Sequence, residues 1–250
     1  MRCKVGILVL LAVAASSSPS NRMSDREAIE TQKLYEKGNY FEGDILFPDG
    51  FNMRNGLTYL PWRWTNNTVY YEIGSEYTDA HKNTIIGALN EIEAATCIKF
   101  VPRTDQPNYI QIKYERPGCL AYIGMIGGPQ LVNLEIPGCV YHHTAMHEVI
   151  HALGFFHQQS AINRDDYVEI LWENIEEDHK YNFDKQDESL ITDFGVKYDY
   201  ESIMHYADTA FSMNGQKTII TKDPAYQKVI GRGRRLSAAD IAKINIMYNC

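Results

Sequence analysis

The run His147-Glu148-Val149-Ile150-His151 constrains this chain more than any other feature of its sequence. On a helix, histidines four residues apart lie one turn apart on the same face, so both imidazoles can contact one metal ion. Glu148 is adjacent to that face, where a carboxylate can accept a proton from an activated water molecule. We therefore expect a helix at residues 144–153 that carries two metal ligands.

The residues after this run supply a third ligand. Gly154 allows the helix to end in a left-handed conformation, after which the chain can bring His157 back toward the same ion. Three neutral imidazoles are typical of zinc and leave positions open for water and substrate. A chance pentapeptide on a solvent-facing helix is the alternative for the first run alone, but it does not explain the glycine and third histidine at their offsets. We predict one Zn²⁺ per chain, bound by His147, His151 and His157.

The first residues predict export. Residues 1–15 begin with Met-Arg-Cys-Lys and continue with an apolar run too short to span a bilayer, which is typical of a signal peptide. No later stretch is apolar enough for a membrane anchor, so a soluble secreted protein is expected. Asn66 begins an Asn-Asn-Thr sequence and is a candidate for N-glycosylation. Loss of Cys3 with the signal leaves an even set of cysteines, which predicts two disulfides but allows three pairings. The set is Cys97, Cys119, Cys139 and Cys250.

Residues 16–54 have the character of a propeptide. Their first part, up to Asn39, is polar and charged with few large apolar residues, so it is not expected to contribute much core. Phe41-Glu42-Gly43-Asp44 follows, and then come a turn signal and the basic residue Arg54. Cleavage after Arg54 by a trypsin-like enzyme would release a catalytic domain of residues 55–250.

Hydrophobic periodicity predicts both strands and helices. Apolar residues alternate from Thr68 to Ile73, the pattern of a half-buried strand, and Thr78 can cap a helix that continues to Ala95. Ser237 and Asp240 form a capping box that begins a last helix. Further strands are expected at residues 98–101, 109–114 and near 131–136.

Length and charge limit the functions available. A chain of 250 residues that is 44% hydrophobic can bury one substantial core or two small lobes. Its formal net charge of -8 provides no basic footprint for nucleic acid. The short basic cluster at residues 232–235 is expected to be a solvated turn before the last helix. We expect a monomer without nucleic-acid or membrane partners.

A second motif, Ser202-Ile203-Met204-His205-Tyr206, follows the histidine motif. A methionine turn downstream of the extended histidine motif marks the metzincins, and Ser-X-Met-His-Tyr in this place resembles the astacin family of zinc endopeptidases. The resemblance covers residues 55–250. It is also carried by Cys119 and Cys139, Arg164-Asp165, Asn182-Phe183-Asp184-Lys185 and Tyr198-Asp199-Tyr200.

The resemblance implies a fold of the α+β class with two lobes. The N-terminal lobe would contain a twisted mixed five-stranded sheet and two long helices, and the C-terminal lobe would be mostly irregular with a terminal helix. The zinc cleft would lie between the lobes. The implied disulfides join Cys97 to Cys250 and Cys119 to Cys139. An extended substrate would add to an edge strand near Gly124-Met125-Ile126 through main-chain hydrogen bonds.

The resemblance also implies roles for single side chains. Met204 would lie beneath the zinc without binding it, and the Tyr206 hydroxyl would bind zinc at rest and stabilise the oxyanion during turnover. In astacin precursors an aspartate in the F-x-G-D setting binds the zinc in place of the catalytic water, which predicts Asp44 as a latency switch. Core packing is the alternative for Tyr206, and an ordinary turn carboxylate is the alternative for Asp44.

Two positions depart from the family pattern. The family usually has glutamate after the third histidine and arginine three residues further on, where this chain has Gln158 and Ala161. Members typically bury the new terminal ammonium against that glutamate. Since Gln158 carries no charge to match a buried ammonium, we expect activity to tolerate changes of the mature N-terminus at Asn55.

Three classes of function are compatible with a secreted disulfide-bonded chain. A zinc-stabilised binding protein without activity would be marked by loss of Glu148 or of a zinc histidine, and this sequence has lost neither. A purely structural disulfide protein does not explain why the histidine motif and Tyr206 occur together. The sequence therefore favours a zinc endopeptidase, made as a latent zymogen, in which Glu148 is the general base.

Overall fold

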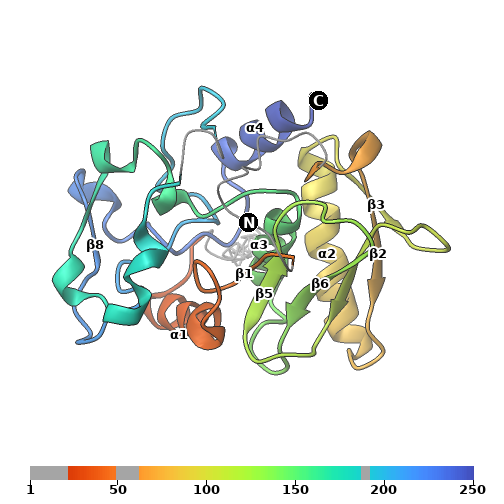
Figure 1. The fold of residues 1–250 in the computed structure, drawn as a ribbon, viewed down its shortest axis with the longest axis horizontal. Coiled ribbons are helices and arrows are strands. Elements are labelled where there is room, and N and C mark those ends of the chain that lie inside the picture. The colour runs from red at the N-terminus through yellow and green to blue at the C-terminus, as the bar shows by residue number, and fades with distance from the viewer. Residues whose placement is uncertain (1–21, 49–61, 187–191) are drawn as a thin grey trace, which may run out of the picture.

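The computed structural model describes residues 22–48, 62–186 and 192–250. The predicted signal peptide and the predicted maturation site at Arg54 and Asn55 lie outside these ranges. The described chain forms two lobes (Figure 1). The sheet and the long helix α2 (Asp79–Ala95) make one lobe, and the segments after helix α3 (His142–Ala152) make most of the other.

A six-stranded mixed sheet forms the base of the first lobe, in the order β1-β5-β6-β4-β2-β3. β5 is antiparallel to β6, whereas the other neighbouring strands are parallel. Strands β2 to β6 form the five-stranded mixed sheet that the family resemblance implied, and β1 adds a sixth strand beside β5. The strands are β1 Ile45–Leu46, β2 Thr68–Ile73, β3 Lys99–Pro102, β4 Tyr109–Lys113, β5 Cys119–Tyr122 and β6 Pro129–Leu134.

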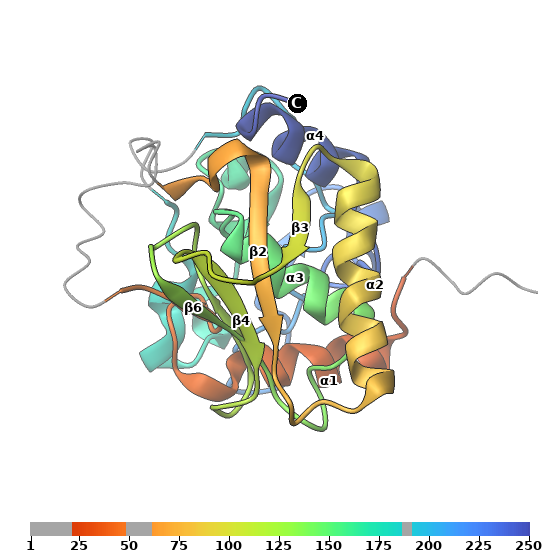
Figure 2. The same cartoon turned by 90° about the vertical axis from the view of Figure 1, so that its right-hand side faces the viewer.

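Helices α2 and α3 pack against each other and share one hydrophobic cluster with the sheet (Figure 2). Thr78 caps α2 as predicted, because its side chain accepts a hydrogen bond from the His81 amide. α3 begins two residues earlier than the predicted start at Thr144. Every residue from Thr144 to Ala152 is buried, so the predicted histidine helix lies inside the molecule.

The second lobe has a separate core. It contains a two-stranded antiparallel sheet of β7 (Val168–Ile170) and β8 (Ile219–Thr221), and aromatic side chains such as Phe183 and Phe211 fill the space around it. The connections contain short 3-10 helices: η1 Glu36–Gly38, η4 Thr65–Asn67, η5 Gln158–Ser160, η6 Arg164–Asp166, η7 Trp172–Asn174, η8 Glu177–Phe183 and η9 Pro224–Tyr226.

The last helix, α4 (Ala238–Met247), packs on the first lobe. Ile244 and Met247 belong to the hydrophobic cluster of the sheet, α2 and α3. The disulfide Cys97–Cys250 joins the last residue, which follows α4, to the segment just after α2. The disulfide Cys119–Cys139 joins β5 to the loop before α3. Both pairings agree with those implied by the family resemblance. One disulfide therefore attaches the segment before α3 to β5, and the other attaches the end of the chain to the segment after α2.

The polar stretch before Asn39 forms a helix, α1 (Asp25–Tyr35), which the sequence analysis did not predict. Ser24 and Glu27 make a capping box at its start, and Ala28, Thr31 and Gln32 are buried. This segment therefore contributes buried residues, contrary to the expectation from its composition.

The basic cluster at residues 232–235 is also more than a solvated turn. Arg232 pairs with Asp25, and Arg234 pairs with Glu27, so two acidic residues in the first turn of α1 lie on this cluster. The earlier expectation was wrong because neither segment alone shows that the other lies beside it. The described part of the predicted propeptide, residues 22–48, is called the pro-segment below.

Asp240 joins α4 to the segment beneath the histidines. It accepts a hydrogen bond from the Ser237 amide in the predicted capping box. The same buried carboxylate accepts hydrogen bonds from the Ser202 hydroxyl at 2.6 Å and the Ile203 amide at 3.1 Å. One side chain therefore stabilises both the helix start and the turn that precedes Met204.

We predict that Asp240→Ala lowers the free energy of unfolding by about 3 kcal/mol, because it removes a helix cap and leaves two buried donors unpaired. Thr78→Ala, which removes only the cap of α2, should cost about 1 kcal/mol. Urea unfolding followed by tryptophan fluorescence, with both disulfides intact, measures the two values. Equal losses would contradict the double role of Asp240.

Candidate metal centre

His147 and His151 come from adjacent turns of α3 and face the same point. Their Nε2 atoms are 3.1 Å apart, and both side chains are buried. The Nδ1 atom of His147 is 2.9 Å from the Ile203 carbonyl oxygen, and that of His151 is 2.7 Å from the Phe155 carbonyl oxygen. Carbonyl oxygens accept hydrogen bonds, so Nδ1 carries the proton in each ring and Nε2 presents a lone pair.

Gly154 ends α3 and returns the chain toward the histidines as predicted. Its φ angle of 106° is open to glycine, and a Cβ here would lie 2.9 Å from the Met247 side chain. After this turn His157 is buried, with its Nε2 atom 3.2 Å from that of His147. The three predicted histidines therefore converge.

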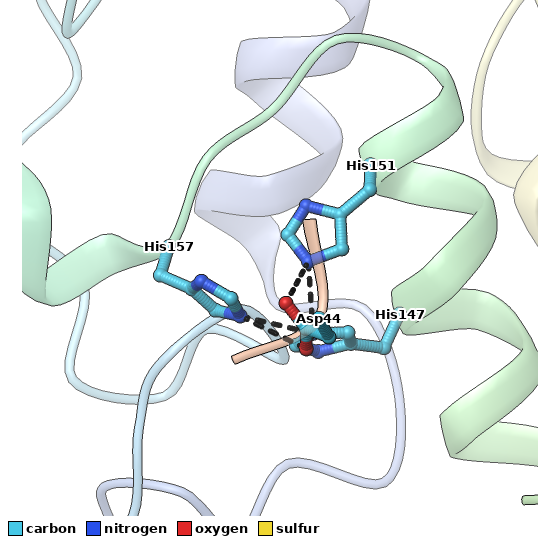
Figure 3. Close-up of side chains that lie close together, drawn as sticks. All are labelled: Asp44, His147, His151 and His157. Atoms are coloured by element: carbon cyan, nitrogen blue, oxygen red, sulfur yellow. Dashed lines mark hydrogen bonds and ion pairs between the residues drawn. The ribbon is translucent and has the colours of Figure 1, made fainter. Parts of the chain in front are cut away.

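Asp44 of the pro-segment is the fourth member of this group (Figure 3). Its Oδ2 atom is 3.2 Å from Nε2 of His147 and 3.4 Å from Nε2 of His157, and its Oδ1 atom is 3.3 Å from Nε2 of His151. The side chain is fully buried. Burial alone would raise the pKa of Asp44, but the surrounding imidazoles outweigh that effect and hold the pKa well below its usual value.

The spacing of these four donors fits a tetrahedral zinc ion. With zinc–ligand distances of about 2.0–2.1 Å, donor atoms around the ion are separated by roughly 3.3–3.4 Å. Five separations among the imidazole Nε2 atoms and the two Asp44 oxygens lie between 3.1 and 3.4 Å, and the four donors all lie within 4.8 Å of one another. Three imidazole nitrogens and a carboxylate that point at one buried position are the ligand types that zinc binds. The group therefore has the geometry and the chemistry of a site for one metal ion.

Glu148 lies in the core beside this group without a partner. It is fully buried, and neither carboxylate oxygen has a hydrogen bond from any described residue. Burial raises the pKa of Glu148, and the negative charge of Asp44 raises it further. A buried carboxylate without a donor is costly, so its place next to the histidines calls for a chemical explanation.

Met204 and Tyr206 also lie near the histidines. Met204 is buried in the first core, and its carbonyl oxygen accepts a hydrogen bond from the Gln158 amide. The Tyr206 ring centre is 4.7 Å from that of His157. Its hydroxyl donates a 2.5 Å hydrogen bond to the Glu42 carbonyl oxygen, so in this structure the pro-segment holds it.

The predicted substrate edge needs a correction. The amides of Gly124, Met125 and Ile126 already donate to the His151 carbonyl, the Trp62 carbonyl and the Gln130 side chain. In this structure β1 of the pro-segment is the outermost strand and pairs with β5. Without β1, β5 would be the edge strand of the sheet. The glycine-rich stretch was misplaced because its backbone forms a loop over the end of α3, where no donor is left for an added strand.

Gln158 directly follows the third histidine, and a cation of the same chain binds it. Its Oε1 atom accepts a 2.5 Å hydrogen bond from Nζ of Lys243 in α4. Burial lowers the pKa of Lys243 although the nearby Asp240 charge acts in the opposite direction.

Two further positions named in the sequence analysis lie outside the metal group. Ala161 packs against the core of the second lobe. Asn66 is exposed at the turn before β2, a position that an N-linked glycan can reach.

Sequence reasoning missed Glu42, whose carboxylate contacts His157 of the metal group. Its Oε2 atom is 2.8 Å from Nδ1 of His157, and its Oε1 atom accepts a hydrogen bond from Gln186. Its place in Phe41-Glu42-Gly43-Asp44 was visible, but no spacing rule shows that Glu42 and Asp44, two residues apart, contact the two different nitrogens of the His157 ring.

Comparison with known proteins agrees with this geometry. The sequence model of Astacin (Peptidase family M12A) matches residues 57–249. The chain belongs to the astacin family. Zinc is therefore its metal ion, and His147, His151, His157 and Asp44 are the group that can hold it.

Named astacin relatives cover most of this chain. Low choriolytic enzyme from Oryzias latipes is 34% identical over 99% of this chain and 98% of its own length. Zinc metalloproteinase nas-8 from Steinernema carpocapsae is 36% identical over 94% of this chain, which spans 56% of that relative. The solved structure of high choriolytic enzyme 1, a hatching enzyme zinc-protease from Oryzias latipes, has a TM-score of 0.69 at 39% identity. It covers 75% of this chain and 93% of its own.

None of the helices in the described ranges combines sufficient length with sufficient apolar character to span a membrane.

We predict that the purified precursor binds one Zn²⁺ per chain and that His151→Ala removes it, because fewer ligands hold zinc poorly. His142→Ala changes a histidine on the same helix outside the donor group and should leave the zinc content unchanged. Elemental analysis after extensive dialysis gives the ratio of zinc to protein. Full zinc retention by His151→Ala would exclude this site.

Proposed function

We propose that this chain is a secreted zinc endopeptidase synthesised as a latent precursor. The observation that carries the proposal is the fully buried, unpaired carboxylate of Glu148 beside three converging imidazoles. A structural zinc site is closed and needs no free acid next to it, whereas peptide hydrolysis needs a general base at that place. A zinc-stabilised binding protein is the alternative, and it leaves the position of Glu148 unexplained.

The chemistry divides between the ion and the side chains. When bound, zinc acidifies a water molecule and polarises the scissile carbonyl. Glu148 takes the proton from that water and passes it to the leaving amine, and no acyl-enzyme forms. The Tyr206 hydroxyl, once it is released from the Glu42 carbonyl, donates a hydrogen bond to the developing oxyanion. The Nδ1 contacts of His147 and His151 keep their Nε2 atoms available as ligands.

Latency follows from three contacts of the pro-segment. Asp44 takes the place of the catalytic water among the zinc donors. Glu42 holds the Tyr206 hydroxyl through its carbonyl oxygen. β1 pairs with the free side of β5, where an extended peptide substrate would otherwise add as a strand. Removal of residues 16–54 by a trypsin-like protease at Arg54 would release all three.

Secretion rests on the signal-like residues 1–15 and on the two disulfides, which persist in oxidising compartments. N-glycosylation at Asn66 would follow from passage through the secretory pathway.

The substrates are proteins or peptides, and the catalytic unit is proposed to act as a monomer. Hydrolysis of a diverse peptide library by the matured protein, with and without a zinc chelator, tests the activity and reads out its preference.

We predict that Glu148→Gln in the matured enzyme lowers kcat by at least about 100-fold while zinc stays bound, because only the proton acceptor is lost. Glu169→Gln, an exposed acid on β7, serves as the matched control and should retain activity. Zinc content and hydrolysis of a quenched fluorescent peptide are measured on the same samples. Near-normal turnover by Glu148→Gln would rule out the general-base assignment.

A second substitution tests latency. In precursors that carry Arg54→Ala to block cleavage, Asp44→Ala should raise peptide hydrolysis about tenfold or more, since each ~1.4 kcal/mol of lost attraction to the ion is a factor of ten. Glu30→Ala, which changes an exposed acid of α1 whose ion pair with Arg26 lies within that helix, is the control. Mass spectrometry confirms that each chain is intact. If both variants remain as inactive as their parent, Asp44 is not the switch.

A further inference from the structure

The three imidazoles differ in what binds their second ring nitrogen. In Figure 3 the second nitrogens of His151 and His157 point away from the donor group. For His147 and His151 the partners are the carbonyl oxygens of Ile203 and Phe155, which belong to the catalytic part of the chain. For His157 the partner is the Glu42 carboxylate at 2.8 Å, which belongs to the pro-segment. One of the three ligands is therefore oriented by a part of the chain that maturation would remove.

Glu42 is held in place for this contact. The residue is 1% exposed and has a φ angle of 47°, a left-handed conformation that non-glycine residues seldom adopt. Its amide donates to Oδ1 of Asn182 at 2.8 Å, and its Oε1 atom accepts from Nε2 of Gln186 at 2.6 Å. Its Oε2 atom accepts from the His157 amide at 3.1 Å in addition to the ring. Both carboxylate oxygens are thus engaged.

Among the described residues, no lysine or arginine forms an ion pair with the Glu42 carboxylate. Within residues 22–48, 62–186 and 192–250, its only ion-pair partner is His157. A buried carboxylate without a cation is costly, and a positive ion on the opposite nitrogen of the same ring would offset that cost. In a common arrangement, one histidine nitrogen binds zinc and the other donates a hydrogen bond to a carboxylate. That outer carboxylate fixes the ring orientation and strengthens the bond to the metal.

We propose that Glu42 is a positioning residue that completes the zinc site of the precursor through His157. It keeps the proton on Nδ1, so that Nε2 of His157 faces the ion, and it is lost together with Asp44 when the pro-segment leaves. The precursor therefore holds zinc more firmly than Asp44 alone would allow, and the site is assembled before maturation. This inference rests on the proposed function, since it assumes that zinc binds here.

The test uses full-length, zinc-loaded precursors with Arg54→Ala, and it measures the rate at which zinc passes to an excess of a coloured chelator. Glu42→Gln keeps the size of the side chain and removes its charge. Zinc release should become about 10- to 100-fold faster, the usual effect of removing an outer carboxylate. The matched control is Glu36→Gln, because Glu36 is another partly enclosed acid of the pro-segment whose Oε1 atom accepts from the Phe211 amide and contacts no zinc donor.

A spectroscopic measurement keeps the proposal testable if Glu42→Gln does not fold. In the zinc-loaded parent precursor, labelled with ¹⁵N-histidine, His157 should show a hydrogen-bonded Nδ1–H resonance far downfield. Where Glu42→Gln folds, this resonance should shift upfield, whereas in Glu36→Gln it should remain. A structural loosening of the pro-segment would affect both variants alike.

The outcomes separate the two proposals. If the parent precursor binds no zinc, the proposed function fails. If it binds one zinc per chain but Glu42→Gln and Glu36→Gln release it at the same rate, the role of Glu42 is overturned and the proposed function stands. Absence of the Nδ1–H resonance of His157 in the zinc-loaded parent would likewise overturn the role of Glu42.

Discussion

The convergence of three buried imidazoles and one carboxylate on a single position is the constraint on which the rest of this structure depends. Nε2 of His147 lies 3.1 Å from that of His151 and 3.2 Å from that of His157, and a single proton on the shared nitrogen cannot satisfy both contacts. One metal ion at their centre can be bound by all four side chains. The folded state of the first lobe is therefore linked to zinc, because metal that binds the folded site stabilises it by mass action.

The surrounding fold keeps the three rings in that arrangement. Residues Thr144 to Ala152 of α3 are buried, and α2 and the sheet share their hydrophobic cluster, while Tyr35 and Asp44 of the pro-segment contact the histidines. The turn before Met204 supplies a carbonyl oxygen to His147, and Asp240 holds that turn against α4. The Cys97–Cys250 disulfide closes the chain behind α4. The metal ligands thus depend on contacts that reach the far end of the sequence.

The pro-segment uses the same surfaces that a substrate would need. Asp44 reaches the donor group, β1 lies on the free side of β5, and the Tyr35 ring stacks on His147 at a centroid distance of 4.5 Å. Asp25 and Glu27 in the first turn of α1 form ion pairs with the basic cluster at residues 232–235. These contacts lie along one continuous stretch of chain, so the proposed maturation at Arg54 would separate all of them from the catalytic domain by one cleavage.

Local patterns in the sequence determined the parts of the site that lie within a few residues of one another. Helical spacing placed His147 and His151 on one face, the glycine at 154 allowed the return of His157, and capping residues marked the starts of α2 and α4, because such features depend on backbone geometry over one or two turns. The resemblance to a known family added the disulfide pairing and Asp44.

Only the tertiary structure decided which distant side chains complete the site. Glu42 lies 115 residues before His157, yet it binds the ring nitrogen that faces away from the other donors. The pairing of α1 with the arginine cluster and the addition of β1 to the edge of the sheet are likewise contacts between segments far apart in the chain. No local pattern encodes such contacts, because they depend on how the lobes bring separate segments together, and periodicity reports only which face of each segment is apolar.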